Sequence, residues 1–190
     1  DIVVRPIATG SWRPVVKGRQ QPALYRASAG LRADFTDFDA LADTLEAGLA
    51  ALDFVPDRIL ATFHGMPQRT LTLGDPYHCQ CAKTARLLSE RVGRPLTITF
   101  QSRFGPAKWL EPATDATLAA LPASGAKKVA LIAPGFSADC LETLEELALR
   151  GRDDFVAAGG TQFAALACLN ASQGGIDLLE ALVRRELAGW

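Results

Sequence analysis

Short apolar runs alternate along this chain with longer segments of helical periodicity, and this alternation restricts the fold more than any other feature. Four runs are rich in β-branched and aliphatic residues and have the length of strands. They occupy residues 59–63, 96–100, 129–133 and 162–167. Strands separated by helices in this way are typical of βαβ units with parallel pairing. We therefore predict a doubly wound α/β fold, with a mainly parallel sheet of about four strands and helices on both faces.

The segments between and around these strands have the apolar spacing of amphipathic helices. The expected helices cover residues 35–53, 75–92, 114–121, 140–157 and 174–187. Gly93 stops the second of them, as a glycine at a helix end commonly does. In the fourth helix, Leu141, Leu144 and Leu147 would form the buried stripe.

Residues 1–33 differ from the rest of the chain. Basic residues far outnumber the single acid, Asp1, and prolines and glycines interrupt the segment repeatedly. The segment shows neither a strand period nor a helix period. We therefore expect an irregular basic arm over residues 1–33, followed by one α/β domain over residues 34–190.

The composition excludes several classes of protein. With 190 residues, 48% hydrophobic and 22% charged, the chain is typical of a globular domain. A net charge of −1 creates no global attraction to nucleic acid or to an anionic membrane. No apolar run is long enough to span a membrane, and the first residues lack the apolar core of a signal peptide. The 4 cysteines show no C-x-x-C spacing, which predicts free thiols in a reducing cytoplasm.

In a parallel sheet the residues that follow each strand meet at one edge, and open α/β sheets bind their ligands there. The expected rim includes His64 after the first strand, Gln101, Ser102 and Arg103 after the second, Phe136, Asp139 and Glu142 after the third, and Asn170 after the fourth. A histidine and two carboxylates therefore converge at this edge. Such a set suits a divalent iron, zinc or manganese ion, and a single histidine is equally suited to accepting a proton.

Each of these residues also has a purely structural interpretation. His64 could be an ordinary hydrogen-bonded histidine at a strand end. Asp139 and Glu142 fit an N-terminal capping box, in which Glu142 reaches back to the backbone N–H of Asp139. Trp109 could pack in the core or form a flat platform for an aromatic ligand. Arg69 could be a surface charge or an anion ligand, and the pattern alone leaves these alternatives open.

Three longer segments resemble the ferrochelatases, the enzymes that insert ferrous iron into protoporphyrin to make haem. They are FHGMPQRTLTLGDPYHCQCAKTARLL (residues 63–88), FQSRFGPAKWLEPATD (residues 100–115) and PGFSADCLETLEEL (residues 134–147). The CLN motif at residues 168–170 and the closing helix are also similar to that family. The motifs occur in the family's order over residues 45–190 and resemble the carboxyl-terminal half of the longer ferrochelatases. The resemblance implies a chelatase-like α/β fold and a lyase activity that forms nitrogen–metal bonds.

The resemblance also implies roles for individual residues. The family's catalytic histidine falls on His64, its catalytic glutamate on Glu142, and the aspartate that supports the glutamate on Asp139. His64 and Glu142 would contact the metal, and the sequence does not divide metal binding and proton transfer between them. The residues expected to bind the porphyrin are Trp109, Phe136, Gln101, Ser102 and Arg69.

Iron takes part in this chemistry as a substrate, so the resemblance implies no tightly bound cofactor. The animal enzymes hold an iron–sulfur cluster on cysteines of a carboxyl-terminal extension, and this chain ends at Trp190 without one. We therefore expect no cluster of that type.

The expected partners are ferrous iron and a porphyrin, either protoporphyrin or a relative such as coproporphyrin. An open apolar cleft edge also favours self-association. The alternatives are a non-catalytic iron- or tetrapyrrole-binding domain, an inactive fragment of a ferrochelatase, and a chelatase that acts on sirohydrochlorin.

Overall fold

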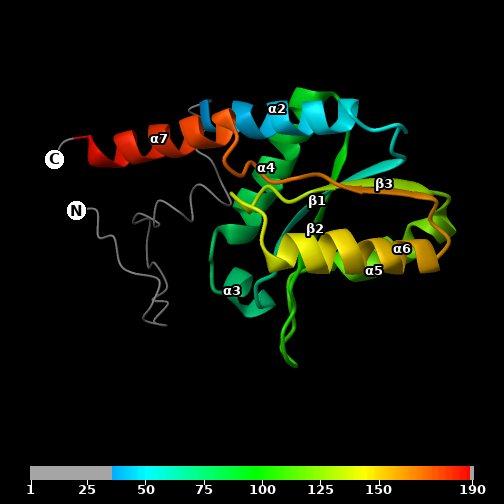
Figure 1. Ribbon diagram of the computed structural model, residues 1–190. Coiled ribbons are helices and arrows are strands. Elements are labelled where there is room, and N and C mark those ends of the chain that lie inside the picture. The colour runs from blue at the N-terminus through cyan, green and yellow to red at the C-terminus, as the bar shows by residue number, and fades with distance from the viewer. Residues whose placement is uncertain (1–35, 189–190) are drawn as a thin grey trace.

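The computed structural model describes residues 36–188, within which four strands form one parallel sheet with the order β2-β1-β3-β4 (Figure 1). The strands are β1 (Arg58–His64), β2 (Leu96–Gln101), β3 (Lys128–Ile132) and β4 (Gln162–Ala165). Their pairing is parallel throughout, which confirms the predicted fold class. The basic arm expected over residues 1–33 lies outside the described residues.

Helices cover both faces of the sheet (Figure 1). One layer contains α2 (Thr36–Ala50), α4 (Tyr77–Val92) and α7 (Gln173–Leu187). The other contains α5 (Thr114–Ala120), η3 (Glu142–Gly151) and α6 (Arg152–Ala157). Two short helices, α3 (Gln68–Thr72) and η2 (Pro122–Ser124), were not expected from the sequence. They are too short to show an apolar period of their own.

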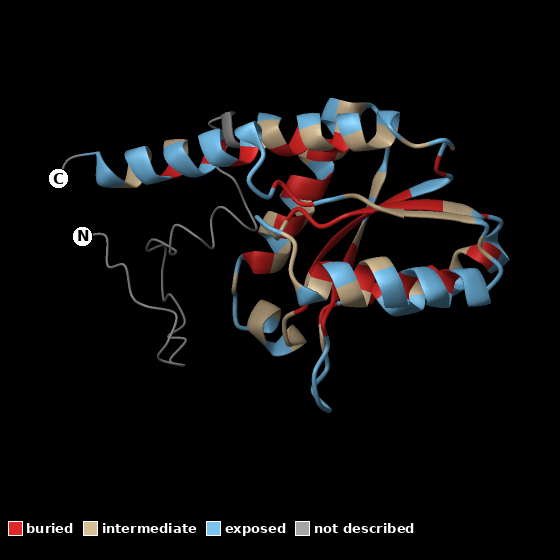
Figure 2. Ribbon diagram, in the orientation of Figure 1, coloured by how far each residue is buried: buried red, intermediate tan, exposed pale blue. Residues whose placement is uncertain are grey.

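The central strand β1 supplies side chains to both apolar layers. Ile59, Ala61 and Phe63 are buried in the cluster that contains α2, α4 and α7. Leu60 is buried in the second cluster, with residues of α5, η3 and α6. Successive side chains of a strand point to opposite faces, so a strand covered on both faces has a nearly continuous apolar sequence. Figure 2 shows the resulting concentration of buried residues along the strands.

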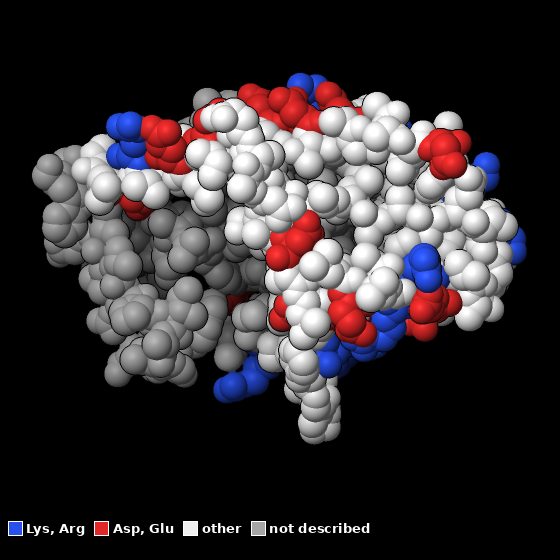
Figure 3. All heavy atoms as spheres, in the orientation of Figure 1, with Lys and Arg blue, Asp and Glu red and all other residues white. Residues whose placement is uncertain are grey.

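The surface carries charges of both signs. Acidic and basic side chains are scattered over the face seen in Figure 3, with uncharged residues between them. Ion pairs such as Arg86–Glu90 and Arg103–Asp115, each at 2.6 Å, join neighbouring opposite charges. This mixture agrees with the weak global field inferred from the net charge. Among residues 36–188, no helix has both the length and the apolar character that a membrane span requires.

The helix expected over residues 140–157 begins with π-helical turns. The π-helix η3 continues directly into α6, so the segment is helical throughout from Glu142. The expected buried stripe is wrong at two positions, because Leu141 and Leu144 are 72% and 56% exposed. The residues that η3 buries are Thr143, Leu147 and Gly151. Their spacing of four fits the wider turn of a π-helix, in which hydrogen bonds join residues five apart.

Candidate functional site

The candidate site lies at the carboxyl edge of the sheet, beside β1. The chain passes from β1 to β2 on one side and then crosses to β3 on the other side, so the direction of winding changes at β1. In open α/β sheets such a switch point is where ligands bind. His64 is the last residue of β1, and it pairs in register with Gln101, the last residue of β2. The structure therefore brings together the ends of the first two strands, as the sequence predicted.

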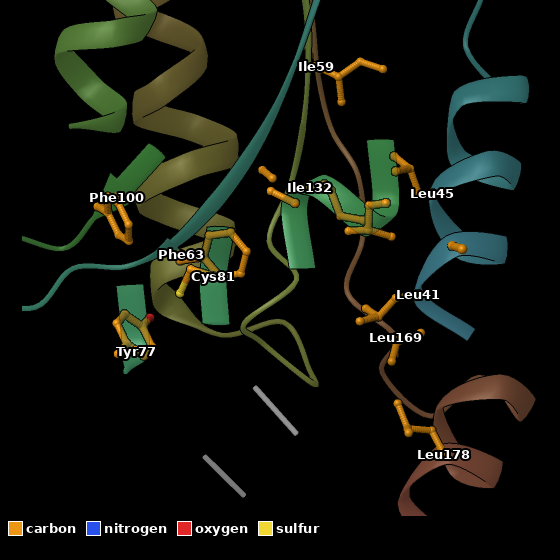
Figure 4. Packing of buried hydrophobic residues seen from close by; sticks show 14 of the residues in the cluster. Leu41, Leu45, Ile59, Phe63, Tyr77, Cys81, Phe100, Ile132, Leu169 and Leu178 are labelled. Atoms are coloured by element: carbon orange, nitrogen blue, oxygen red, sulfur yellow. The ribbon is translucent and has the colours of Figure 1, made fainter. Parts of the chain in front are cut away.

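The main chain of His64 is fixed from two directions. Tyr77, which belongs to the core cluster shown in Figure 4, donates from its hydroxyl to the carbonyl oxygen of His64 at 2.7 Å. The next residue, Gly65, donates its N–H to the carbonyl oxygen of Gln101 at 2.7 Å. A Cβ atom on Gly65 would lie 2.6 Å from that oxygen, so the close approach requires glycine.

A hydrogen bond of the His64 ring selects its neutral tautomer. Nδ1 lies 2.8 Å from the carbonyl oxygen of Gly65. A carbonyl oxygen can only accept, so Nδ1 carries the hydrogen and Nε2 of the neutral ring keeps its lone pair. Nε2 is therefore the nitrogen that can bind a metal ion or accept a proton.

Aromatic side chains lie around the His64 ring. The ring centroids of Phe104 and Phe136 are each 6.4 Å from that of His64. Trp109 meets Phe104 edge-on at 6.0 Å and donates its indole N–H to the Phe104 carbonyl at 3.1 Å. Because Phe104 is 65% exposed, an apolar face remains open beside the histidine. Phe104 was not expected at the site, because its only signal in the sequence is an aromatic residue in a loop soon after a strand.

Glu142 is the first residue of η3 and is half-buried near His64. A hydrogen bond from the Cys140 side chain makes the largest contribution that lowers the pKa of Glu142. A bond from the backbone N–H of Glu142 lowers this pKa further, and the nearby His64 adds a smaller electrostatic effect in the same direction. The Glu142 carboxyl is therefore ionised at neutral pH, close to the candidate histidine.

Asp139 joins three segments of the chain. Its Oδ1 accepts from the Thr143 hydroxyl at 3.0 Å and from the Cys168 backbone N–H at 3.3 Å, and its Oδ2 accepts from Asn170 Nδ2 at 2.7 Å. Burial by itself would raise the pKa of Asp139, but the hydrogen bonds from these neighbours outweigh it and lower the pKa. The carboxylate thus holds the start of η3 against the loop that follows β4.

The capping box expected at Asp139 and Glu142 does not form. The backbone N–H of Asp139 donates to Asn170 Oδ1 at 2.8 Å, so this donor is already satisfied without Glu142. The N-cap position of η3 is Leu141, which makes no side-chain capping bond. Asn170 adopts a φ of 51°, in the left-handed region that asparagine tolerates better than most residues. A residue far along the chain therefore takes the place that the local pattern assigned to Glu142.

Two of the residues expected to bind porphyrin are bonded to other parts of the protein. Gln101 is 2% exposed, and its amide contacts Thr62 and Glu142. Ser102 is 5% exposed and donates to the carboxylate of Glu146. Arg69 is exposed on α3. The structure brings Gln101 and Ser102 to the predicted edge, but against η3.

The described residues contain no group of three or more His, Cys, Asp or Glu side chains arranged to hold a metal ion. His64 and Glu142 remain as two candidate donors.

The four cysteines are free thiols that differ in exposure. Cys79 is exposed and Cys140 is half-buried, whereas Cys81 and Cys168 are buried. Burial raises the pKa of Cys81 to about 12 and also raises the pKa of Cys168. The two buried thiols are therefore protonated and unreactive at neutral pH.

One family model, that of ferrochelatase, matches residues 35–187. The chain belongs to the ferrochelatase family. The curated ferrochelatase of Allorhizobium ampelinum is 50% identical over 183 residues, which are 95% of this chain and 53% of that protein. The ferrochelatase of Rhizobium meliloti is 49% identical over 95% of this chain and 54% of its own length. That of Methylocella silvestris is 45% identical over 100% of this chain and 53% of its own length.

This chain spans about half the length of the curated ferrochelatases that it matches. Membership of the ferrochelatase family confirms the resemblance drawn from the sequence motifs. The alignment with the M. silvestris protein covers the whole chain and so includes residues 1–33, whereas the family model begins at residue 35. The domain boundary expected near residue 33 stays a prediction.

Proposed function

We propose that this chain forms one side of a ferrochelatase site, the side that carries the metal-binding residues His64 and Glu142. At this site ferrous iron enters protoporphyrin IX or a close relative. The observation that carries the proposal is the position of His64, whose Nε2 keeps its lone pair, at the switch point of the sheet. It pairs in register with Gln101, and the Gln101 amide is bonded to the main chain of Glu142. The ferrochelatase names of the relatives support the type of reaction. Because the chain spans about half their length, the activity of this chain is itself part of the proposal.

The residue types suit the chemistry of metal insertion. The porphyrin must lose both pyrrole protons, and Fe²⁺ must exchange its water ligands for ring nitrogens. Nε2 of His64 can accept a pyrrole proton or bind the incoming ion, and the Glu142 carboxylate can bind the ion or relay a proton. Nδ1–H keeps its bond to the Gly65 carbonyl in both protonation states, so the ring need not turn as it gains a proton. Iron and porphyrin are substrates in this scheme, and no resident cofactor is required.

Aromatic side chains supply the surface for the flat ring. Phe104 and Phe136 lie beside the His64 ring, Trp109 packs against Phe104, and all three would contact a porphyrin face. Pressure from such an apolar wall bends the macrocycle and exposes its nitrogen lone pairs. Arg69, exposed on the neighbouring α3, would pair with a porphyrin carboxylate. We propose that the reaction takes place in the cytoplasm, where the four free thiols would stay reduced.

A second candidate function is binding of iron or a tetrapyrrole without catalysis. It is favoured by the exposure of large apolar side chains, namely Phe104 beside His64 at 65%, and Leu141 and Leu144 around the start of η3 at 72% and 56%. A catalytic cleft would cover such residues from the opposite side. The described residues provide one wall, so binding without turnover is a distinct outcome for this chain.

A metallation assay separates the two functions. The 190-residue chain is incubated under anaerobic conditions with protoporphyrin and Fe²⁺, and the product is followed by absorbance. Turnover that disappears in His64→Ala supports the enzyme, whereas porphyrin binding without metallation supports the binding domain. Absence of both binding and metallation would contradict both functions for this chain.

A further inference from the structure

The last residue of β2, Gln101, and the residue after it, Ser102, are bonded to η3 at two separate points. Gln101 donates from Nε2 to the backbone carbonyl oxygen of Glu142 at 3.0 Å. Ser102 donates its backbone N–H and its hydroxyl to the Glu146 carboxylate at 2.7 and 2.6 Å. The chemistry assigned to His64 and Glu142 does not by itself require these contacts. The function of these contacts is therefore separate from metal binding and proton transfer themselves.

The amide of Gln101 has a fixed orientation. The Glu142 carbonyl can only accept, so the NH₂ group of Gln101 must face it. Oε1 then faces Thr62, whose hydroxyl donates to it at 3.0 Å and also lies 2.8 Å from the hydroxyl of Thr114. The side chains of Gln101, Thr62 and Thr114 are all buried. If the amide turned toward a ligand, buried partners would lose their hydrogen bonds, which is costly.

Ser102 makes the second contact from an unusual backbone conformation. Its φ of 60° lies in the left-handed region, which residues with a side chain adopt rarely and at some cost. At this residue the chain leaves β2 and enters the loop that carries Phe104. Two short hydrogen bonds to a carboxylate hold the turn, and they use both donors of Ser102.

These contacts connect the candidate glutamate to the candidate histidine. Gln101 pairs in register with His64, and its carbonyl oxygen accepts from the N–H of Gly65. A single strand residue is thus bonded both to the main chain next to His64 and to the main chain of Glu142. The contact at Glu142 and the contact at Glu146 together restrict both sliding and rotation of η3.

We propose that Gln101 and Ser102 are positioning residues that set the Glu142 carboxylate beside Nε2 of His64, and that they are not porphyrin ligands. The proposal rests on the proposed function, because it assumes that His64 and Glu142 handle the metal. Loss of the Gln101 amide should then weaken metal binding only through Glu142. It should also loosen the first turns of η3, whether or not a metal binds.

A double-mutant cycle with Co²⁺ tests the first consequence. Co²⁺ is titrated into the 190-residue chain and followed by paramagnetic broadening of the His64 ring signals in NMR spectra. Methionine has a length similar to glutamine and cannot donate, so Gln101→Met should weaken Co²⁺ binding about tenfold. In a Glu142→Gln background the same substitution should have no further effect. Equal weakening in both backgrounds, or no weakening in either, would overturn the proposal.

A matched control uses the same substitution at a distant strand. Gln162 begins β4, at the opposite edge and the opposite end of the sheet. Gln162→Met should leave the affinity for Co²⁺ unchanged. If it weakens binding as much as Gln101→Met, the effect reports general destabilisation and the positioning role fails.

Hydrogen exchange tests the second consequence without any metal. The amides of residues 143–147 should exchange several-fold faster in Gln101→Met than in the unchanged chain. Ser102→Ala, which keeps one of the two bonds to Glu146, should give a smaller effect and serves if Gln101→Met does not fold. Should Co²⁺ fail to bind at His64 at all, the metal-handling function is contradicted, whereas exchange still decides the positioning role. Unchanged exchange in these variants would overturn it.

Discussion

Tyr77, the first residue of α4, donates from its hydroxyl to the backbone carbonyl of His64, the last residue of β1, at 2.7 Å. This bond joins the start of a helix to the end of the strand that carries the candidate histidine. The tyrosine ring lies in the core next to that strand, so its position is set by packing (Figure 4). The place of the His64 main chain is therefore determined by the hydrophobic core beneath the site.

We predict that Tyr77→Phe lowers the free energy of unfolding by about 1 kcal/mol, since it removes a partly buried hydrogen bond and keeps the ring. Chemical denaturation measures this change. The control is Thr161→Val, which removes a hydroxyl bonded at 3.0 Å to an exposed carbonyl of Lys127. That substitution should cost less than about 0.5 kcal/mol. Equal losses in the two variants would show that the Tyr77 hydroxyl has no special structural role.

We predict that His64→Ala abolishes metallation, with a loss on the order of a hundredfold or more, and changes the melting temperature little. The side chain is half-buried at a strand end, so little packing is lost. The chain has 2 histidines, and the other one, His78, provides the control. Its ring stacks on Phe100 at 5.6 Å, so His78→Ala should lower stability but retain metallation. The reverse pattern of activities would remove His64 from the mechanism.

Glu142→Gln separates the charge of Glu142 from its place in the helix. Because the expected capping box is absent, the substitution should leave the melting temperature almost unchanged. Metal affinity and turnover should both fall at least tenfold, because the negative charge is lost. Glu145→Gln, which breaks an exposed pair with Arg150 in the same helix, should leave both intact. A large loss of stability with normal metal affinity would assign Glu142 a structural role alone.

The sequence predicted the sheet well, because the central strands β1 and β3 are almost continuously buried. The prediction was poorer for β4, which is only partly buried and ends at Ala165, two residues before the expected end. Residues 59–63 and 129–133 were expected as strands, and β1 and β3 differ from these ranges by one residue at each end or less. The π-helical turns of η3 were not predictable in this way. An apolar residue at every third or fourth position suits an ordinary helix, and the Leu141, Leu144 and Leu147 pattern favoured one. Gln101 contacts Glu142 and Ser102 contacts Glu146, and both contacts join segments that are far apart in the sequence. The local pattern of residues 140–157 therefore could not reveal them.

Placement of the site residues at one edge was also predictable, but their contacts were not. His64 and Gln101 were expected at the same edge of the sheet, and the register places them directly beside each other. The partner of Asp139 is Asn170, which lies after β4 and has no local signal that connects the two. Hydrogen bonds between segments far apart in the sequence decide whether a carboxylate caps a helix, holds a loop or faces a ligand.

The stability that Asp139 contributes should depend on pH. Its pKa is lowered by folding, so its contribution is fully present above the pKa of the unfolded chain and is lost as the pH falls through the lower folded value. Asp139→Asn should cost about 1 kcal/mol at pH 7 and less near about pH 3, below the usual pKa of an unfolded aspartate. Denaturation at both pH values measures the difference. Asp39→Asn, at an exposed position of α2, should cost little at either pH, and an equal cost of Asp139→Asn at both would contradict the assigned hydrogen bonds.

Porphyrin binding by this chain should be weak, because ligand pockets usually enclose about 70–90% of a comparable ligand and one wall covers little more than a single face. Phe104, Phe136 and Trp109 lie on the described wall. We expect a dissociation constant in the micromolar range or above, about 10⁻⁶ M or weaker. The exposed Phe104, Leu141 and Leu144 should also promote self-association. Titration with protoporphyrin and measurement of the mass in solution test both expectations. Leu144→Glu should reduce association without removing His64 or Glu142. Tight one-to-one binding by a monomer would mean that another part of this chain covers the second face of the ring.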